Sequence, residues 1–204
     1  MLDEKNKAAV KDILSKMKDD VEVMFFTSKD CKYCPNEKKL LSDIAKVSNL
    51  KIKELDLKSE EAKKYGVEHA PAVIFSKNPQ IRFVGLPSGH EFRNFLDTIL
   101  MVSGHDTEIK DEVKEGLKEL KEPVDIKVFV TPTCPYCPAA VHTAHQFAAL
   151  SDKVTSTMIE ATEFPELSQK HGVMSVPKIV INDNKSWEGA VPEHIFLKKI
   201  KEAL

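Results

Sequence analysis

The chain contains two stretches in which alternating apolar and polar positions lead directly into a helical pattern. In the first, Val21, Val23 and Phe25 alternate with their neighbours, and a period of two predicts a strand with one buried face. The apolar positions that follow recur at three- and four-residue steps, and they are Leu40, Leu41, Ile44 and Val47. A strand therefore gives way to a helix, and the same change of pattern follows residues 124–130.

The remaining patterns of the first half complete one structural unit. Its predicted elements, in chain order, are a helix near 8–17, a strand at 21–27, a helix after 31, a strand at 50–56, a helix at 59–65, strands at 70–75 and 81–84, and a helix over 92–100. We expect Phe92 and Phe95 to lie on the core face of this last helix. Ser88 and Glu91 have the spacing of a capping box at its start.

The same order of elements begins again after residues 103–106. The elements predicted for the second half are a helix at 109–120, a strand at 124–130, a helix after 137, a strand at 154–159, a helix at 164–170, strands at 176–181 and 185–187, and a helix at 195–204. Three landmarks repeat at similar intervals: Cys31 and Cys134 are 103 residues apart, Pro71 and Pro177 are 106 apart, and Gly85 and Gly189 are 104 apart. The sequence therefore predicts two copies of one fold, in residues 1–104 and 105–204.

The order of elements also predicts the class of fold. Parallel strands need a crossover connection such as a helix, whereas antiparallel strands need only a turn. Each unit is predicted to contain a strand, a helix and a strand, followed by a hairpin and a helix. This order predicts a mixed β-sheet flanked by helices, which is an α/β fold.

Composition narrows the classes of function. The 204 residues are 42% hydrophobic and 30% charged, with a formal net charge of −2, so the chain lacks the basic surface of a nucleic-acid-binding protein. No stretch of about 18 apolar residues predicts a membrane span, and the charged first residues lack the apolar core of a secretory signal. We therefore expect a cytoplasmic protein, in which paired cysteines are more often catalytic or metal-bound than structural. The charged fraction is compatible with a thermophilic source.

All four cysteines belong to two C-x-x-C pairs, Cys31 with Cys34 and Cys134 with Cys137. A thiol attacks a disulfide only as the thiolate, and the start of a helix favours that anion through its unpaired N–H groups and macrodipole. The first cysteine of each pair is then the candidate nucleophile. The second lies about one turn further and can attack the mixed disulfide to release the substrate.

The two pairs differ in their central residues, which are Lys32 and Tyr33 in the first and Pro135 and Tyr136 in the second. A lysine pointing inward would favour the thiolate, and a proline stiffens the loop. We therefore expect different redox potentials at the two sites.

Together these features resemble the thioredoxin and glutaredoxin superfamily. A strand, a C-x-x-C at a helix start and a later proline before a hairpin are typical of it, and Cys134-Pro-Tyr-Cys137 is the glutaredoxin-type motif. The tandem arrangement is similar to the two-domain protein disulfide oxidoreductases of thermophilic prokaryotes, which are related in chemistry to protein disulfide isomerase. Residues 85–92 and 131–138 are particularly similar to that family.

The resemblance has implications for the site and its partners. It implies two tandem thioredoxin-like folds and cis peptide bonds before Pro71 and Pro177, with the backbones of Ala70 and Val176 facing a substrate peptide. It implies protein dithiols or disulfides as substrates, a thioredoxin-reductase-like flavoenzyme as the electron source and peroxiredoxins as further partners. Redox-active disulfides would serve in place of a separate cofactor or metal. By the closer match of its motif, we expect the Cys134 site to be the more active one.

One departure from the family concerns proton transfer. The buried acid that thioredoxins carry six residues before the first cysteine is replaced by Phe25 and Val128. Asp56 and Glu160, at strand ends, are candidates for its role, and a solvated carboxylate is an equally good interpretation of either.

Two alternative functions remain open at this point. Four cysteines in two C-x-x-C pairs could bind zinc, although zinc ribbons typically separate their pairs by about 15–20 residues and here Cys34 and Cys134 are 100 apart. The fold could also serve as a dithiol electron carrier or docking module for a peroxidase system, since a fold alone does not determine a function.

A few other residues carry weaker signals. His142 and His145 are three residues apart and could share a helical face as metal ligands, but we interpret them as surface residues. His69 precedes Ala70 and is interpreted as a loop residue, and Trp187 is expected to pack on the second hairpin.

Overall fold

The structure is a computed structural model of the chain, and it describes residues 2–204. Two compact units can be distinguished in it. The first consists of residues up to Leu86 together with Phe95–Asp106, and the second consists of Pro87–Asn94 together with Thr107–Leu204. The predicted boundary between residues 104 and 105 remains a proposal. The two compact units differ from it, because residues 87–94 group with the second half and residues 105–106 with the first.

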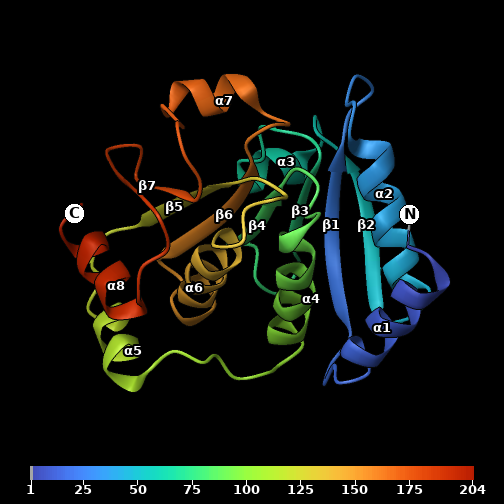
Figure 1. Ribbon diagram of the computed structural model, residues 1–204, viewed down its shortest axis with the longest axis horizontal. Coiled ribbons are helices and arrows are strands. Elements are labelled where there is room, and N and C mark those ends of the chain that lie inside the picture. Colours follow the sequence, from blue (N-terminus) through green and yellow to red (C-terminus); the bar gives the residue numbers. More distant parts are fainter. Residues whose placement is uncertain (1) are drawn as a thin grey trace. The chain divides into compact units, whose positions relative to one another are not determined.

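The first half forms the elements that its pattern predicts (Figure 1). They are α1 (Glu4–Leu14), β1 (Val21–Thr27), α2 (Cys34–Ala45), β2 (Leu50–Asp56), α3 (Glu60–Tyr65), β3 (Ala72–Phe75), β4 (Ile81–Val84) and α4 (His90–Val102). Strand β1 is central, parallel to β2 and antiparallel to β3, and β4 pairs with β3 as the predicted hairpin. The strand order is therefore β2-β1-β3-β4, a mixed sheet.

The second half repeats this plan. Its elements are α5 (Asp111–Lys118), β5 (Val124–Val130), α6 (Cys137–Leu150), β6 (Val154–Glu160), α7 (Pro165–Lys170), β7 (Lys178–Ile181), β8 (Lys185–Glu188) and α8 (Glu193–Lys201). Strand β5 is parallel to β6 and antiparallel to β7, and β8 pairs with β7. The order β6-β5-β7-β8 matches the first unit, so the prediction of two tandem mixed sheets is confirmed.

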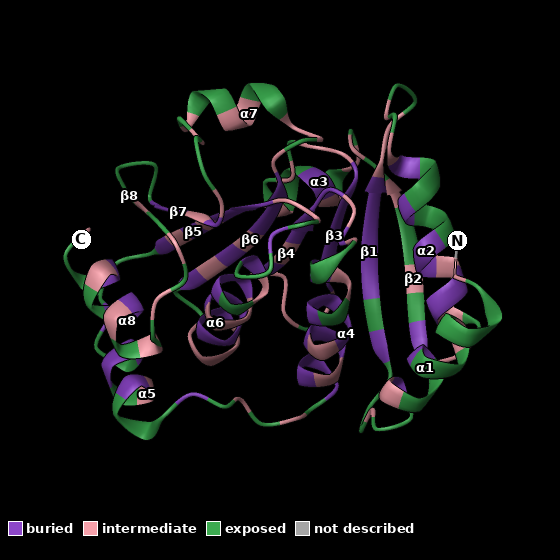
Figure 2. Cartoon of the chain, viewed as in Figure 1, coloured by how far each residue is buried: buried purple, intermediate pink, exposed green. Residues whose placement is uncertain are grey.

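Burial follows the alternation that the sequence shows. The central strands β1 and β5 are largely buried in Figure 2, because helices cover the sheets and remove their apolar side chains from water. In the first unit the rings of Phe75, Phe83 and Phe95 contact one another, with centroids 5.0–6.3 Å apart. In the second unit Phe196 of α8 packs edge-on against Phe147 and Trp187. Each unit therefore has its own aromatic core.

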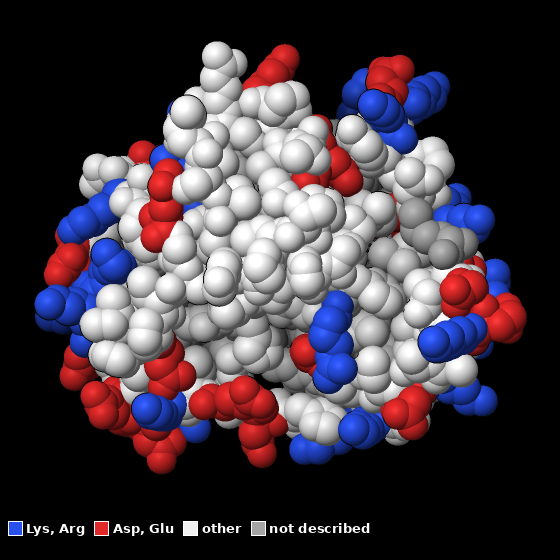
Figure 3. Space-filling model, viewed as in Figure 1, with Lys and Arg blue, Asp and Glu red and all other residues white. Residues whose placement is uncertain are grey.

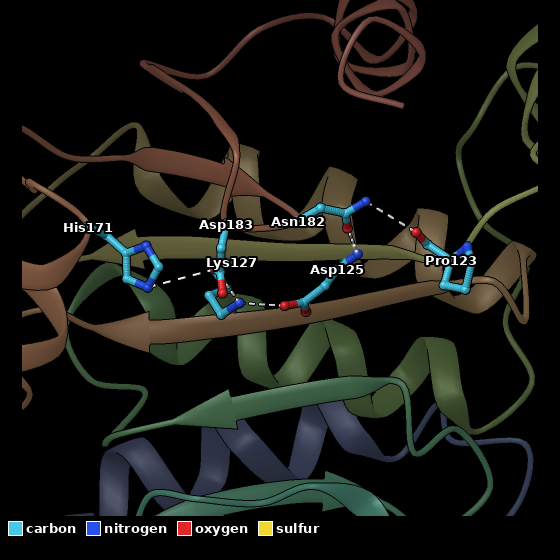
Figure 4. A network of polar contacts seen from close by, with 6 residues as sticks. All are labelled: Pro123, Asp125, Lys127, His171, Asn182 and Asp183. Atoms are coloured by element: carbon cyan, nitrogen blue, oxygen red, sulfur yellow. Dashed lines mark hydrogen bonds and ion pairs between the residues drawn. The ribbon is translucent and has the colours of Figure 1, made fainter.

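A polar network joins the turn between β7 and β8 to strand β5 (Figure 4). The ammonium group of Lys127 pairs with the carboxylates of Asp125 and Asp183. The Nε2 atom of His171, at the end of α7, lies 3.8 Å from Asp183 Oδ1, and the His171 ring is tilted against the Phe129 ring with centroids 5.3 Å apart. Burial lowers the pKa of His171 below its ordinary value. The network therefore ties the β7–β8 turn to β5 and lies beside the end of α7, where the loop leading to Pro177 begins.

Among residues 2–204, no helix is long and apolar enough to cross a membrane.

Candidate active site

The first cysteine pair lies between the end of β1 and the first turn of α2. Helix α2 begins at Cys34, with Pro35 in its first turn, where a missing N–H group costs no helical hydrogen bond. Cys31 and Cys34 form a disulfide with an S–S distance of 2.00 Å. The backbone N–H of Cys34 donates a hydrogen bond to Sγ of Cys31 at 3.1 Å. The first sulfur therefore lies at the N-terminus of the helix, where a thiolate is stabilised.

The second pair has the same placement but holds two thiols. Strand β5 ends at Val130, and α6 begins at Cys137 with a proline in its first turn. Cys134 is 7% exposed and Cys137 is fully buried. The thiol of Cys134 donates a weak hydrogen bond to the carbonyl oxygen of Val176 at 3.6 Å. The fold thus brings together two residues that are 42 positions apart in the sequence.

The prolines occupy equivalent places in the two units. The peptide bonds Ala70–Pro71 and Val176–Pro177 are both cis, as the resemblance implied. The carbonyl oxygens of Pro71 and Pro177 accept hydrogen bonds from the backbone N–H groups of Gly85 and Gly189, at 3.0 and 2.8 Å. Each proline is therefore tied to the end of its own hairpin, beside the strand that leads to the cysteines.

A buried carboxyl group lies near the second pair. Glu91, in the first turn of α4, is 1% exposed and accepts a hydrogen bond from Asn94 Nδ2 at 2.9 Å. Burial raises the pKa of Glu91 to about 7. The pKa of Cys137 is also raised, mainly by burial, with further contributions from its hydrogen bond to Cys134 and from the charge of Glu91. A group that titrates near neutral pH therefore acts electrostatically on the second thiol.

A close backbone contact sets the position of Glu91. The N–H group of His90 donates a hydrogen bond to the carbonyl oxygen of Pro132 at 3.0 Å, and Pro132 belongs to the loop that leads to Cys134. Gly89 has a positive φ of 61°, and a Cβ atom there would lie 2.1 Å from that same oxygen. Only glycine allows this approach without a shift of the loop.

The predicted capping box at Ser88 and Glu91 is wrong. The box requires Glu91 at the third helical position, but α4 begins at His90, so Glu91 is the second residue of the helix. Its side chain is buried and acts on Cys137 instead. A sequence signal did exist, because Glu91 stands four residues before Phe95 and so falls on the apolar face of the helix.

The two acids proposed from the sequence, Asp56 and Glu160, both accept hydrogen bonds in the turns that follow their strands. Asp56 is exposed and accepts a hydrogen bond from the N–H group of Lys58, as expected for a turn carboxylate. Glu160 is 2% exposed, so it is not a solvated carboxylate. It accepts hydrogen bonds from the N–H and hydroxyl groups of Thr162 and from the N–H group of Glu163, and therefore closes the turn after β6.

The interpretation of His145 as a surface residue is also wrong. Its side chain is fully buried, with Nδ1 2.8 Å from the hydroxyl group of Ser156 on β6, and burial lowers the pKa of His145 to about 3. His142 is half-buried. Across residues 2–204, no group of three or more histidine, cysteine or acidic side chains is arranged to hold a metal ion.

The fold and the cysteine geometry define a class: α/β units in which a redox-active dithiol starts a helix beside a cis-proline loop. Comparison with known proteins agrees with this description. Residues 124–202 match the model of the thioredoxin domain family. The crystal structure of a protein disulfide oxidoreductase from Aeropyrum pernix superposes with a TM-score of 0.92 and 34% identity, over 100% of this chain and 94% of the other.

Other relatives are alkyl hydroperoxide reductase proteins known as AhpF. The Staphylococcus epidermidis protein is 30% identical over 98% of this chain, which spans 38% of that protein's length. The structure of AhpF from Enterococcus faecalis shares the fold, with a TM-score of 0.88 at 23% identity over 98% of this chain and 99% of the other. The chain belongs to the thioredoxin superfamily and has the two-domain arrangement of the Aeropyrum pernix protein.

Proposed function

We propose that the chain exchanges disulfides with protein substrates at two dithiol centres, in which Cys31 and Cys134 are the attacking residues. The observation that carries this proposal is the arrangement around Cys134. Its sulfur is the more exposed of the pair and touches the backbone of Val176, whereas Cys137 lies fully buried behind it. Of the two cysteines, Cys134 is therefore the one placed for attack by or on a substrate.

The exchange proceeds in two displacements. The thiolate of Cys134 attacks one sulfur of the substrate disulfide, whose S–S bond breaks, and the other substrate sulfur leaves as a thiolate. Cys137 then loses its proton and attacks Sγ of Cys134, so that the second substrate sulfur also leaves. Two electrons have passed to the substrate, and Cys134 and Cys137 are joined by a disulfide. The reverse sequence oxidises a substrate dithiol.

The roles of the remaining residues follow from these steps. The backbones of Ala70 and Val176, held by Pro71 and Pro177, are proposed to pair with the substrate chain. Because the raised pKa of Cys137 disfavours its thiolate, the second displacement needs a proton acceptor. Glu91 is proposed for this role, since a carboxyl group with a pKa of about 7 can accept and return a proton near neutral pH. Replacing it with glutamine is expected to slow release of the mixed disulfide by about tenfold.

The relatives support a place in a peroxidase system. Because the chain resembles part of the alkyl hydroperoxide reductase AhpF, we propose that it passes electrons from a thioredoxin-reductase-like flavoenzyme to substrates that include a peroxiredoxin. A role as dithiol electron carrier in such a system is the second candidate. In both roles the redox-active disulfides serve as the electron-carrying groups, and we propose that the protein works in the cytoplasm.

Insulin reduction by dithiothreitol tests the proposed activity. The chain is expected to accelerate precipitation of the insulin B chain, and the double variant Cys31→Ser/Cys134→Ser is expected to reduce the rate to that of dithiothreitol alone. A double variant that retained the acceleration would contradict the proposal. An active chain that reduced a peroxiredoxin but not insulin would favour the electron-carrier role.

A further inference from the structure

Two segments that flank Cys134 contain no charged residue of their own, and one ammonium group, that of Lys178, donates a hydrogen bond to the carbonyl oxygen of Gly172 at the far end of the second segment. These segments are residues 131–139, which contain the cysteine pair, and residues 172–177, which lead to Pro177, and neither contains a charged residue. They meet at the hydrogen bond between Cys134 and the carbonyl oxygen of Val176. Among residues 2–204, three large hydrophobic side chains are exposed, and two of them, Tyr136 and Met174, belong to these segments, with exposed fractions of 71% and 90%.

The corresponding segments of the first unit are charged. Lys29, Asp30 and Lys32 surround Cys31, and the loop leading to Pro71 carries Glu68 three residues before the proline, where the second unit has Met174. Charges of both signs cluster at the upper right of Figure 3, over the loop between β1 and α2. The ammonium group of Lys32 lies 5.1 Å from the centre of the Tyr33 ring, so a charge also covers the aromatic residue of this site.

The chemistry of the exchange identifies what must lie on these surfaces. A disulfide bond joins Cys134 to its substrate during the reaction, so the residues flanking the substrate cysteine lie against Tyr136 and Met174 at that moment. Methionine adapts its shape to varied apolar partners, and tyrosine offers a rigid ring with a polar edge. An extended polypeptide with apolar side chains beside its disulfide fits such a surface, and it would bury these two side chains.

We propose that Met174 and Glu68 determine the substrate preference of their sites. The Cys134 site selects polypeptide disulfides flanked by apolar residues, as in unfolded protein, and the Cys31 site selects against them. This inference rests on the proposed function, because it assumes that both sites exchange disulfides. Met174 and Glu68 are specificity residues, since neither takes part in bond making or proton transfer.

Single-site proteins and two matched peptides test the proposal. Cys31→Ser/Cys34→Ser isolates the second site, and Cys134→Ser/Cys137→Ser isolates the first. The probes are two fluorogenic peptides of equal length that contain one internal disulfide, flanked by leucine and phenylalanine in one and by serine and asparagine in the other. The measured quantity is the ratio of kcat/KM for the apolar peptide to kcat/KM for the polar peptide.

The expected ratio is about tenfold higher at the second site than at the first, which corresponds to about 1.4 kcal/mol of differential binding. Met174→Glu, and the uncharged Met174→Gln, are each expected to remove most of this difference, mainly through KM for the apolar peptide. The reciprocal Glu68→Met is expected to raise the ratio at the first site. Leu204→Glu, at the third exposed hydrophobic residue, is the matched control and leaves the ratio unchanged.

Two results would overturn the inference, and they are distinguishable. If both Met174 variants keep the ratio within twofold while the exchange continues, the specificity proposal is wrong and the proposed function stands. If the protein that retains only Cys134 and Cys137 reduces neither peptide, the proposed function fails at that site and the inference fails with it.

Discussion

The two cysteine sites have the same backbone plan and different surroundings. In the first, Cys31 and Cys34 form a disulfide, and Glu37, one turn further along α2, is fully buried. In the second, both thiols are free, the position three residues after Cys137 is Ala140, and the buried acid that acts on Cys137 is Glu91 from α4. The comparison shows that a duplicated fold can keep its helix start and proline loop while its buried acids come from different elements.

The largest expected effect concerns which of the two cysteine sites reduces insulin faster. If the Cys134 site is the more active one, Cys134→Ser reduces the rate of insulin reduction more than Cys31→Ser does, because the exposed side chains of Tyr136 and Met174 suit an unfolded chain. Initial rates at equal protein concentration measure the difference. The opposite order of the two variants would contradict the comparison.

A second effect concerns the backbone contact between Gly89 and Pro132 near the second site. Gly89→Ala places a Cβ atom on the carbonyl oxygen of Pro132 and adds a strained positive φ, so we expect a loss of about 3 kcal/mol in the free energy of unfolding. Gly66→Ala is the matched control. It has almost the same φ of 62° but open space around the new atom, so only about 1 kcal/mol is lost.

Urea denaturation of the two alanine variants measures both losses. Gly89→Ala is also expected to slow exchange at Cys134, since the loop that carries Pro132 must move. Equal losses in the two variants would show that the contact with Pro132 contributes nothing.

A third effect is the pH dependence of stability that Glu91 introduces. Between its ordinary pKa of 4.5 and its folded pKa of about 7, folded Glu91 keeps a proton that the unfolded chain has released. Stability therefore falls as the pH rises through this window, by roughly 3 kcal/mol in total at about 1.4 kcal/mol per pH unit. Glu91→Gln removes this dependence, so the variant matches the parent near pH 4 and exceeds it at pH 8.

Unfolding free energies of the parent and Glu91→Gln, compared at several pH values, isolate the contribution of this one group. A difference that stayed constant with pH would mean that the pKa of Glu91 is not raised.

The smallest expected effect concerns the network in Figure 4, whose central ammonium group pairs with two carboxylates. Lys127→Met leaves Asp125 and Asp183 without this ammonium group, so we expect a loss of about 1 kcal/mol. Denaturant unfolding measures the loss, and a variant as stable as the parent would show that the pairs contribute nothing net.

Much of the fold could be predicted from the sequence, because its signals are local. Alternating residues such as Val21 and Val23 define strands by themselves, and the recurrence of Pro71 as Pro177 reveals the duplication. The cysteine positions at helix starts follow from the same patterns.

Other features depend on contacts between distant segments. The burial of His145 requires Ser156 on β6, which supplies a hydrogen bond inside the core. Glu91 is 46 residues before Cys137, and its position depends on the close approach of Gly89 to Pro132. No periodicity in the sequence encodes such a contact. Local patterns could therefore supply only the acids at strand ends, Asp56 and Glu160, as candidates for proton transfer.

The grouping of residues 87–94 with the second unit determines which part of the gene encodes the second site. A gene fragment that encoded only residues 105–204 would contain both cysteines of the second site but neither Gly89 nor Glu91. A mutation in the first half of the gene can therefore alter the surroundings of the second cysteine pair. Separating the two units would require a cut that follows the contacts rather than one cut between residues 104 and 105.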